Sequence, residues 1–278
     1  MEKIYRYYRN VQHDIDSLAN SYLWASKLSD FNDPFEGSDY NNIDFSCYSK
    51  LTNSEAITIW KNIHKEKNHS MIKIEKALLK YFIDEPDGYN IKADIEDAAR
   101  RMIITQCNYA NKHYYVSFVK DGENKTALEN KLMWSHYSDG LRGYVVEFSI
   151  ENLSRSIREN NSNFGQFFNI HYHDNVSFDF SKFYTTKDFN YNSERFVFRK
   201  TIDWNYENEL RLMSTEQKVK YSPNSINKII IGERMGDCQR VTLITILKGI
   251  FPNEWKKKLY ESYIDKKTLK ILIRPYEV

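Results

Sequence analysis

The residues with the clearest potential for chemistry lie in the segment WNYENELRLM, residues 204–213. If Glu207 to Met213 forms a strand, its period of two places Glu207, Glu209 and Arg211 on one face. Two carboxylates beside a guanidinium could stabilise an oxocarbenium-like centre or orient a sugar hydroxyl, as Asp and Glu do in glycosidic bond chemistry. The alternative is a solvated strand face whose ion pairs contribute about 0 to 1 kcal/mol. The pattern leaves both interpretations open.

A second candidate segment, residues 129–148, crowds Trp134, His136 and Tyr137 at the end of a predicted helix. Such side chains most often pack or satisfy a helix end, but they could also line a ligand site. The sequence HYH at 171–173 places two His on one strand face without a third ligand in view. We therefore predict no metal site.

The amino-terminal stretch IYRYY, residues 4–8, alternates Arg6 with Tyr5 and Tyr7 on a predicted strand. An Arg in this position could bind a phosphate or ribose oxygen, or it could cover aromatic surface with its aliphatic stem. The chain has no Gly-rich phosphate loop of Walker or Rossmann type. Side chains and helix termini would therefore have to hold any bound nucleotide.

The loop FNDPFE, residues 31–36, carries two aromatic rings where a loop would normally favour water. Asp33 followed by Pro34 favours a turn, and Asn32 can cap through its side chain. In that interpretation Phe31 and Phe35 anchor a rigid turn to the core. The sequence does not say what the rings contact.

Composition narrows the class of protein. The 278 residues are 41% hydrophobic and 28% charged, which excludes a disordered or fibrous chain. A net charge of +2 creates no strong field for nucleic acid or anionic membrane. The three Cys stand far apart without a CxxC pair, and the start of the chain lacks a signal-peptide pattern. No apolar run is long enough to span a bilayer, so we expect a cytoplasmic protein.

Strand-like and helical segments alternate without a regular βαβ rhythm, which predicts one α+β domain over residues 1–278. We expect a mixed or antiparallel sheet and a helical insertion at about 53–110. The other helical candidates are a short helix in 14–21, then 125–137, a segment after Asp188, and 242–251. The strand candidates are residues 3–8, 22–26, 113–119, 143–150, 167–173, 207–214, 226–233 and 268–276.

Three ordered segments, FNDPFE at 31–36, LMWSHYSDGLRGYVVEF at 132–148 and WNYENELR at 204–211, resemble a bacterial family known as domain of unknown function 2971. The resemblance extends from Tyr5 to about Gly232 and implies no biochemistry. The order of the elements is also similar to ADP-ribosyltransferase folds. It begins with IYRY, a short helix, a strand and a loop, and a strand with ExE follows much later.

This second resemblance implies roles for individual residues. Arg6 would bind the dinucleotide NAD, Glu209 would help to break the nicotinamide bond, and Glu207 would orient the acceptor. Ser135, His136 or Tyr137 would replace the usual Ser-Thr-Ser strand only loosely. The full set of nucleotide-binding residues that we expect is Arg6, Tyr7, Asn32, Asp33, Trp134, His136, Tyr137 and Arg211.

The leading functional hypothesis is an NAD-consuming transferase that adds ADP-ribose to a protein or nucleic acid, in a toxin or phage-defence setting. One alternative is a nucleotide- or partner-binding module without turnover. Another is a nucleic-acid enzyme or binder that uses basic and aromatic stretches such as FVFRK at 196–200.

Overall fold

A computed structural model describes residues 2–33, 48–66, 70–84, 89–123, 125–162, 165–173 and 198–277. Four sequence predictions lie outside the described residues: the turn at Pro34, the packing of Phe35, the helix after Asp188, and the start of the basic stretch at 196–197. The chain divides into two compact units. The first contains Met1–Phe31, His113–Tyr172 and Ile202–Val278, and the second contains Asn32–Lys112 and His173–Thr201.

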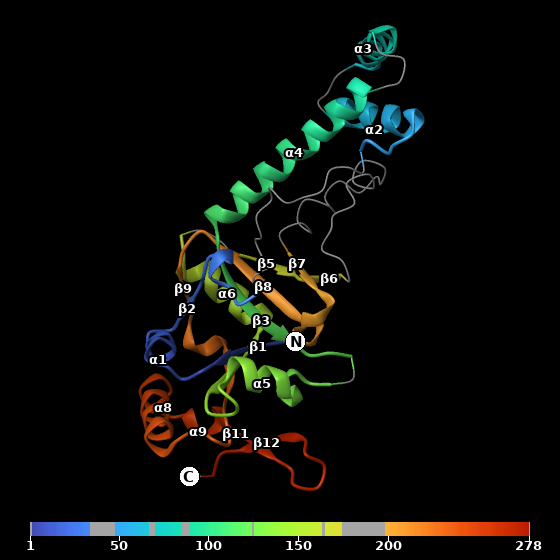
Figure 1. Cartoon of the computed structure of the whole chain (residues 1–278). Coiled ribbons are helices and arrows are strands. Elements are labelled where there is room, and N and C mark those ends of the chain that lie inside the picture. The colour runs from blue at the N-terminus through green and yellow to red at the C-terminus, as the bar shows by residue number, and fades with distance from the viewer. Residues whose placement is uncertain are drawn as a thin grey trace. The chain divides into compact units, whose positions relative to one another are not determined.

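An eight-stranded sheet forms the centre of the first unit, with the strand order β12-β11-β10-β4-β1-β3-β8-β5 (Figure 1). The pair β10 and β11 is parallel and the other neighbours are antiparallel, so the predicted mixed sheet of an α+β fold is confirmed. Its strands are β1 (Lys3–Tyr8), β3 (Tyr114–Lys120), β4 (Tyr144–Ser149), β5 (Gln166–Asn169), β8 (Glu209–Ser214), β10 (Ile226–Ile231), β11 (Leu259–Ile264) and β12 (Ile271–Pro275).

Short elements and helices surround this sheet. A two-stranded sheet pairs β2 (Tyr22–Trp24) with β9 (Lys218–Lys220). The short strand β6 (His171–His173) follows β5 in the chain, and the short strand β7 (Arg199–Thr201) belongs to the second unit. The helices of the first unit are α1 (Gln12–Ala19), α5 (Lys131–Tyr137), α6 (Ile150–Asn160), α8 (Asp237–Ile250) and α9 (Trp255–Lys258). Its 3-10 turns are η1 (Leu28–Asp30), η3 (Ala127–Glu129), η4 (Ile202–Glu207) and η5 (Pro223–Ser225).

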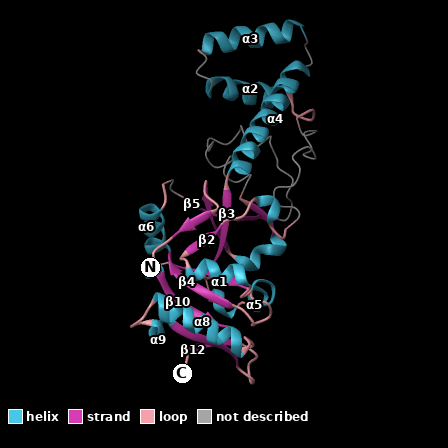
Figure 2. Cartoon of the chain, turned by 90° about the vertical axis from the view of Figure 1, so that its left-hand side faces the viewer, coloured by secondary structure: helices cyan, strands magenta, loops and turns pink. Residues whose placement is uncertain are grey.

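Both faces of the sheet are buried. On one face, Leu18 of α1, Leu153 of α6 and Leu243 of α8 pack over apolar strand residues, and Figure 2 shows α8 lying across β10. On the other face, Met133 and Trp134 of α5 pack over a second cluster. Because helices cover both faces, the strand β4 is buried along its whole length, which explains its almost continuous apolar sequence.

Three helices occupy the second unit at the segment that the sequence predicts to be helical: α2 (Asn53–Glu66), α3 (Met71–Asp84) and α4 (Tyr89–Lys112). They bury a core of their own around Trp60, Ile95 and Ile103. Whether the two units act as the single domain 1–278 stays a prediction. Among the described residues, no helix has the length and apolar character needed to span a membrane.

Two predicted elements are shorter than expected. The helix predicted from Lys125 begins only at Lys131, because the Asn130 side chain caps it by accepting hydrogen bonds from the Leu132 and Met133 amides. The strand predicted from Glu207 begins at Glu209. Between η4 and β8 the backbone passes through Asn208 at φ 41°, a left-handed conformation that Asn tolerates better than most residues.

Candidate functional site

The carboxylate of Glu209 and the guanidinium of Arg211 form an ion pair inside the protein. Arg211 Nη2 lies 2.7 Å and Nε lies 2.8 Å from Glu209 Oε1. Ser117 Oγ donates a further hydrogen bond to the same oxygen at 2.5 Å. Glu209 is 3% exposed and Arg211 is fully buried. The interpretation of this face as solvated is therefore wrong, because β8 lies inside the sheet between β3 and β5.

The Phe31 ring covers the same guanidinium. Its centroid lies 4.8 Å from the Arg211 Cζ atom, which is the geometry of a cation–π contact. A guanidinium is flat and weakly hydrated, so it can stack on an aromatic face while it binds a carboxylate at its edge. Phe31 is thus an anchor for the buried pair, and this explains one of the two rings in the FNDPFE loop.

Glu207 does not share a strand face with Glu209. It lies at the end of η4, is buried, and accepts a hydrogen bond from the Tyr137 hydroxyl. The prediction that both carboxylates project from one strand is therefore wrong, because the strand begins two residues later. The contact joins η4 to α5, and these two segments are far apart in the sequence.

Arg6 and Glu209 project from opposite faces of the sheet. In the strand register Tyr5 lies opposite Val119, and Val119 lies opposite Glu209, so these three side chains share one face. Arg6 follows Tyr5 in β1 and therefore points to the other face. The register therefore does not bring Arg6 and Glu209 together, and their roles in an NAD site stay a prediction.

The surroundings of Arg6 are those of a structural residue. Its guanidinium donates to the carbonyl oxygens of Ser117 at 3.3 Å and Trp24 at 3.1 Å. The Arg6 Cζ atom also lies 5.3 Å from the centroid of the Tyr8 ring. These contacts tie β2 to the centre of the sheet.

Tyr7 and Trp134 pack against each other. Their ring centroids are 5.4 Å apart in an edge-to-face arrangement. The Trp134 indole N–H donates to the Leu128 carbonyl at 2.8 Å, and the Tyr7 hydroxyl donates to the Ala127 carbonyl at 2.8 Å. Both polar tips are satisfied by η3, so both residues hold α5 and η3 against the sheet.

The remaining predicted binding residues are distributed over both units. His136 Nδ1 lies 3.1 Å from the Tyr206 hydroxyl, which places an imidazole and a phenol together near the protein surface. Asn32 and Asp33 belong to the second unit, where Asn32 is exposed and Asp33 is buried. Their contact with a ligand stays a prediction.

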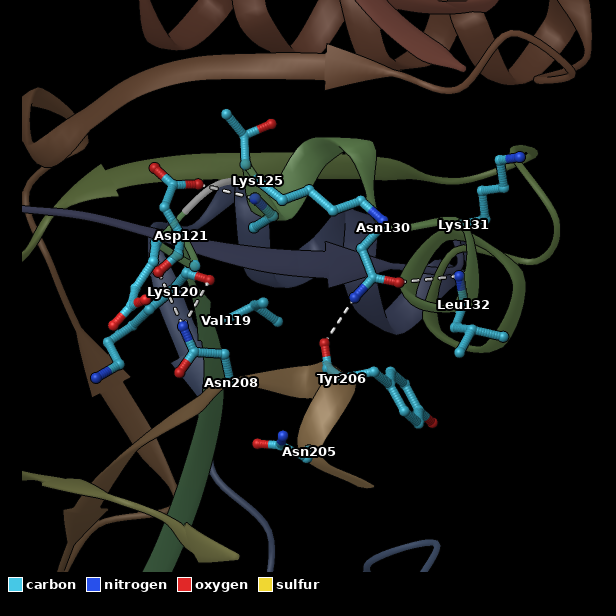
Figure 3. Close-up of a pocket in the computed structure, with 14 residues that line it drawn as sticks. Val119, Lys120, Asp121, Lys125, Asn130, Lys131, Leu132, Asn205, Tyr206 and Asn208 are labelled. Carbon is cyan, nitrogen blue, oxygen red and sulfur yellow. Dashed lines mark hydrogen bonds between the residues drawn. The ribbon is translucent and has the colours of Figure 1, made fainter. Parts of the chain in front are cut away.

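A polar pocket of about 1,020 Å³ lies in the first unit where β3, the loop after it, α5 and η4 come together (Figure 3). Three cations, Lys120, Lys125 and Lys131, and two acidic residues, Asp121 and Glu123, line it. The Lys120 ammonium also donates a hydrogen bond to Asn169 Oδ1 at 2.6 Å. The side of the pocket that η4 forms is lined by Asn205 and Tyr206. None of the site residues predicted from the sequence lines this pocket. The sequence feature that could have indicated the pocket is the group of three lysines around the turn after β3, close to the Asn130 cap of α5.

Hydrogen bonds fix the walls of this pocket. The Asn130 side chain caps α5 and also donates to the Tyr206 carbonyl at 2.6 Å. The Asn208 side chain donates to the carbonyl oxygens of Lys120 at 3.2 Å and Asp121 at 2.9 Å, as Figure 3 shows. These bonds join η4 and the residue after it to both other walls, so the walls are held in place by the protein itself.

Asp121 anchors the loop at the base of the pocket. Its carboxylate accepts hydrogen bonds from the Tyr5 hydroxyl at 3.1 Å and from the Ala127 amide at 2.8 Å. The pKa of the Tyr5 phenol is raised well above its ordinary value. Burial is the larger cause, and the negative charge of Asp121 is the second. Tyr5 therefore stays a hydrogen-bond donor at neutral pH.

The lysines, amides and phenol that line the pocket are groups that could recognise a polar anion. Lysine ammonium groups bind phosphate as point charges, amide side chains bind bases and hydroxyls, and a phenol ring offers a surface for stacking. Among the described residues, no group of three or more His, Cys, Asp or Glu is arranged to hold a metal ion.

Comparison with known families supports the resemblance inferred from the sequence. The model of a family described as a protein of unknown function (DUF2971) matches residues 133–212, and the family resemblance is confirmed over this segment. The segment contains both partners of the Tyr137–Glu207 contact and of the Glu209–Arg211 ion pair. No curated protein and no solved structure matches the chain significantly.

Proposed function

We propose that this protein binds NAD or a related nucleotide in the polar pocket of the first unit. The observation that carries the proposal is the combination of three lysines, amide side chains and the Tyr206 residue around a cavity of about 1,020 Å³. Cavities that hold ligands of nucleotide size typically measure about 300 to 1,000 Å³. The lysines take the place of the Gly-rich phosphate loop that the sequence lacks.

Within the pocket we assign the phosphates to Lys125 and Lys131, which line the cavity and are exposed. Asn205 is exposed beside them and supplies an amide donor and acceptor for a ribose hydroxyl or a base edge. The hydrogen bond between Tyr206 and His136 holds the phenol in one orientation. A base stacked on that ring would lie beside the residues that bind its phosphates.

We expect NAD and ADP-ribose to raise the melting temperature of the protein, because a ligand that binds only the folded state stabilises it. The combined change of Lys125→Gln and Asn205→Ala should weaken binding about tenfold or more, since it removes a charged and a polar contact. Isothermal titration calorimetry on both proteins measures the effect.

The matched control for this test is Lys257→Gln, which removes an exposed lysine of α9 outside the pocket. It should leave the affinity unchanged. Equal affinity in the pocket variant and the wild type would show that nucleotides do not bind here. Absence of any melting shift with NAD, ADP-ribose and AMP would contradict the proposal as a whole.

A second candidate function is ADP-ribose transfer in the cytoplasm, with Glu209 as the catalytic carboxylate and a protein or nucleic acid as acceptor. The observation in its favour is that Arg211 and Ser117 hold the Glu209 carboxylate on the sheet face that also carries Val119, a residue of the pocket wall. A toxin or phage-defence setting follows only from the resemblance to ADP-ribosyltransferase folds.

The proposed step breaks the bond between nicotinamide and ribose C1′ and forms a bond from C1′ to a nucleophile of the acceptor. Nicotinamide leaves as the neutral base and carries the bonding electron pair, and the nucleophile releases its proton to solvent. A carboxylate near C1′ stabilises the positive charge that develops on the ribose. Glu207 would orient the acceptor in this scheme.

Mass spectrometry of nicotinamide release and of ADP-ribose transfer, with NAD and a cell lysate, tests this candidate. We expect release by the wild type and none by Glu209→Gln, because the amide cannot stabilise the developing charge. Circular dichroism must show that the variant is folded. Equal release by both proteins contradicts the role of Glu209. Nucleotide binding without release by the wild type assigns the protein to the binding modules.

A further inference from the structure

A second cavity of about 310 Å³ lies in the first unit, between the end of α5 and the strands β11 and β12. We infer that it binds a small amphipathic carboxylate, a molecule with an aliphatic chain and one carboxylate head. The inference is independent of the nucleotide proposal, although Lys131 borders both cavities. The cavity is lined chiefly by Trp134, Leu141, Ile271, Leu269, Lys131 and Arg234.

The interior of this cavity is apolar. Trp134, Leu141 and Ile271 are buried and form its inner wall. At its opening, Ile264 is 37% exposed and Leu269 is 61% exposed. Large apolar side chains gathered at the mouth of an apolar cavity favour contact with a ligand that brings apolar surface of its own. The aliphatic chain of the ligand meets this requirement.

Two leucines of the cavity have a backbone conformation that leucine rarely adopts. Leu141 has φ 70° and Leu269 has φ 54°, both in the left-handed region. They belong to different loops, and both side chains line the cavity. Backbone strain of this kind persists where the surrounding structure enforces it, and it is concentrated at ligand-binding positions.

The charges at the cavity select an anionic head group. Lys131 and Arg234 both line it, and the described lining residues include no acidic side chain. Neither cation forms an ion pair within the described part of the chain. Arg234 Nη1 donates one long hydrogen bond, 3.4 Å, to the Gly140 carbonyl at the cavity. The guanidinium has five donors, so several remain for a carboxylate.

Isothermal titration calorimetry of the full chain with octanoate tests this inference. We expect octanoate to bind, whereas acetate, which lacks the chain, and octyltrimethylammonium, which carries the opposite charge, should not. Arg234→Gln should weaken octanoate binding about tenfold or more, because it removes the charged partner of the head group. Arg155→Gln, at an exposed position of α6, is the matched control and should leave the affinity unchanged.

A second variant separates binding from folding. Leu269→Asn removes apolar surface at the opening, and Asn tolerates a left-handed backbone better than Leu. Its melting temperature should equal or exceed that of the wild type, while octanoate binds at least several-fold more weakly. Three results would overturn the inference: no octanoate binding, binding unchanged in both variants, or equal binding of octyltrimethylammonium.

Discussion

Arg211→Met is expected to lower the free energy of unfolding by about 3 to 5 kcal/mol, the typical cost of removing one partner from a buried ion pair. The variant removes the Arg211 guanidinium from the buried Glu209 carboxylate, to which Ser117 still donates a hydrogen bond. A charge in that position is poorly solvated by the surrounding protein. The Phe31 ring also loses the guanidinium that it covers.

Urea denaturation followed by circular dichroism measures this effect. The double variant Glu209→Leu with Arg211→Met should be more stable than Arg211→Met alone, because it removes both charges and leaves apolar side chains. Arg142→Met, at an exposed position, should change the free energy of unfolding by no more than about 0.5 kcal/mol. The single variant Glu209→Leu completes the comparison. If the double variant lost as much free energy of unfolding as the two single variants lose in sum, the two residues would not be coupled.

The protein is expected to lose stability steeply above pH 10. Buried tyrosines keep their protons in the folded state, whereas in the unfolded chain they ionise near pH 10, and this favours unfolding. Tyr8, Tyr144 and Tyr221 pack in the core on one face of the sheet, with the Tyr8 and Tyr144 rings stacked at 4.8 Å. Burial raises the pKa of each of these phenols, and the charge of neighbouring tyrosines raises the pKa of Tyr144 and Tyr221 further.

The sign of the pH dependence follows from proton linkage. The pKa of these tyrosines is higher in the folded state than in the unfolded chain, where it is about 10. Their contribution to stability is therefore complete below pH 10 and is lost as the pH rises from there through the folded-state pKa. In that pH window, each such tyrosine lowers the free energy of unfolding by up to about 1.4 kcal/mol per pH unit.

Urea denaturation at several pH values between 8 and 11, with tyrosinate absorbance as a second signal, tests this expectation. The tyrosinate absorbance of the buried tyrosines should appear together with unfolding. Tyr144→Phe should flatten the alkaline slope, because it removes one raised pKa together with the hydrogen bond to the Asp14 carbonyl. Tyr109→Phe changes a tyrosine that is 52% exposed and should leave the slope unchanged. Smooth ionisation of all tyrosines in the folded protein would contradict the prediction.

The sequence by itself determined the local elements and the class of fold. The helices between Asn53 and Lys112 follow from apolar spacing, and the strand β4 follows from its apolar run. Irregular alternation of the two kinds of element indicated an α+β fold with a mixed sheet. The segments at 31–36, 132–148 and 204–211 indicated a resemblance to a family, which the family model confirms over residues 133–212. These features depend on residues that are close together along the chain.

Only the tertiary structure decided which side chains meet. Alternation in β8 correctly placed Glu209 and Arg211 on one face, but the position of β8 between β3 and β5 decided that this face is buried. The strand register decided that Arg6 points to the opposite face. The two cavities join segments that are distant in the sequence. Periodicity reports local geometry, whereas burial and contact depend on what the rest of the chain places against each face.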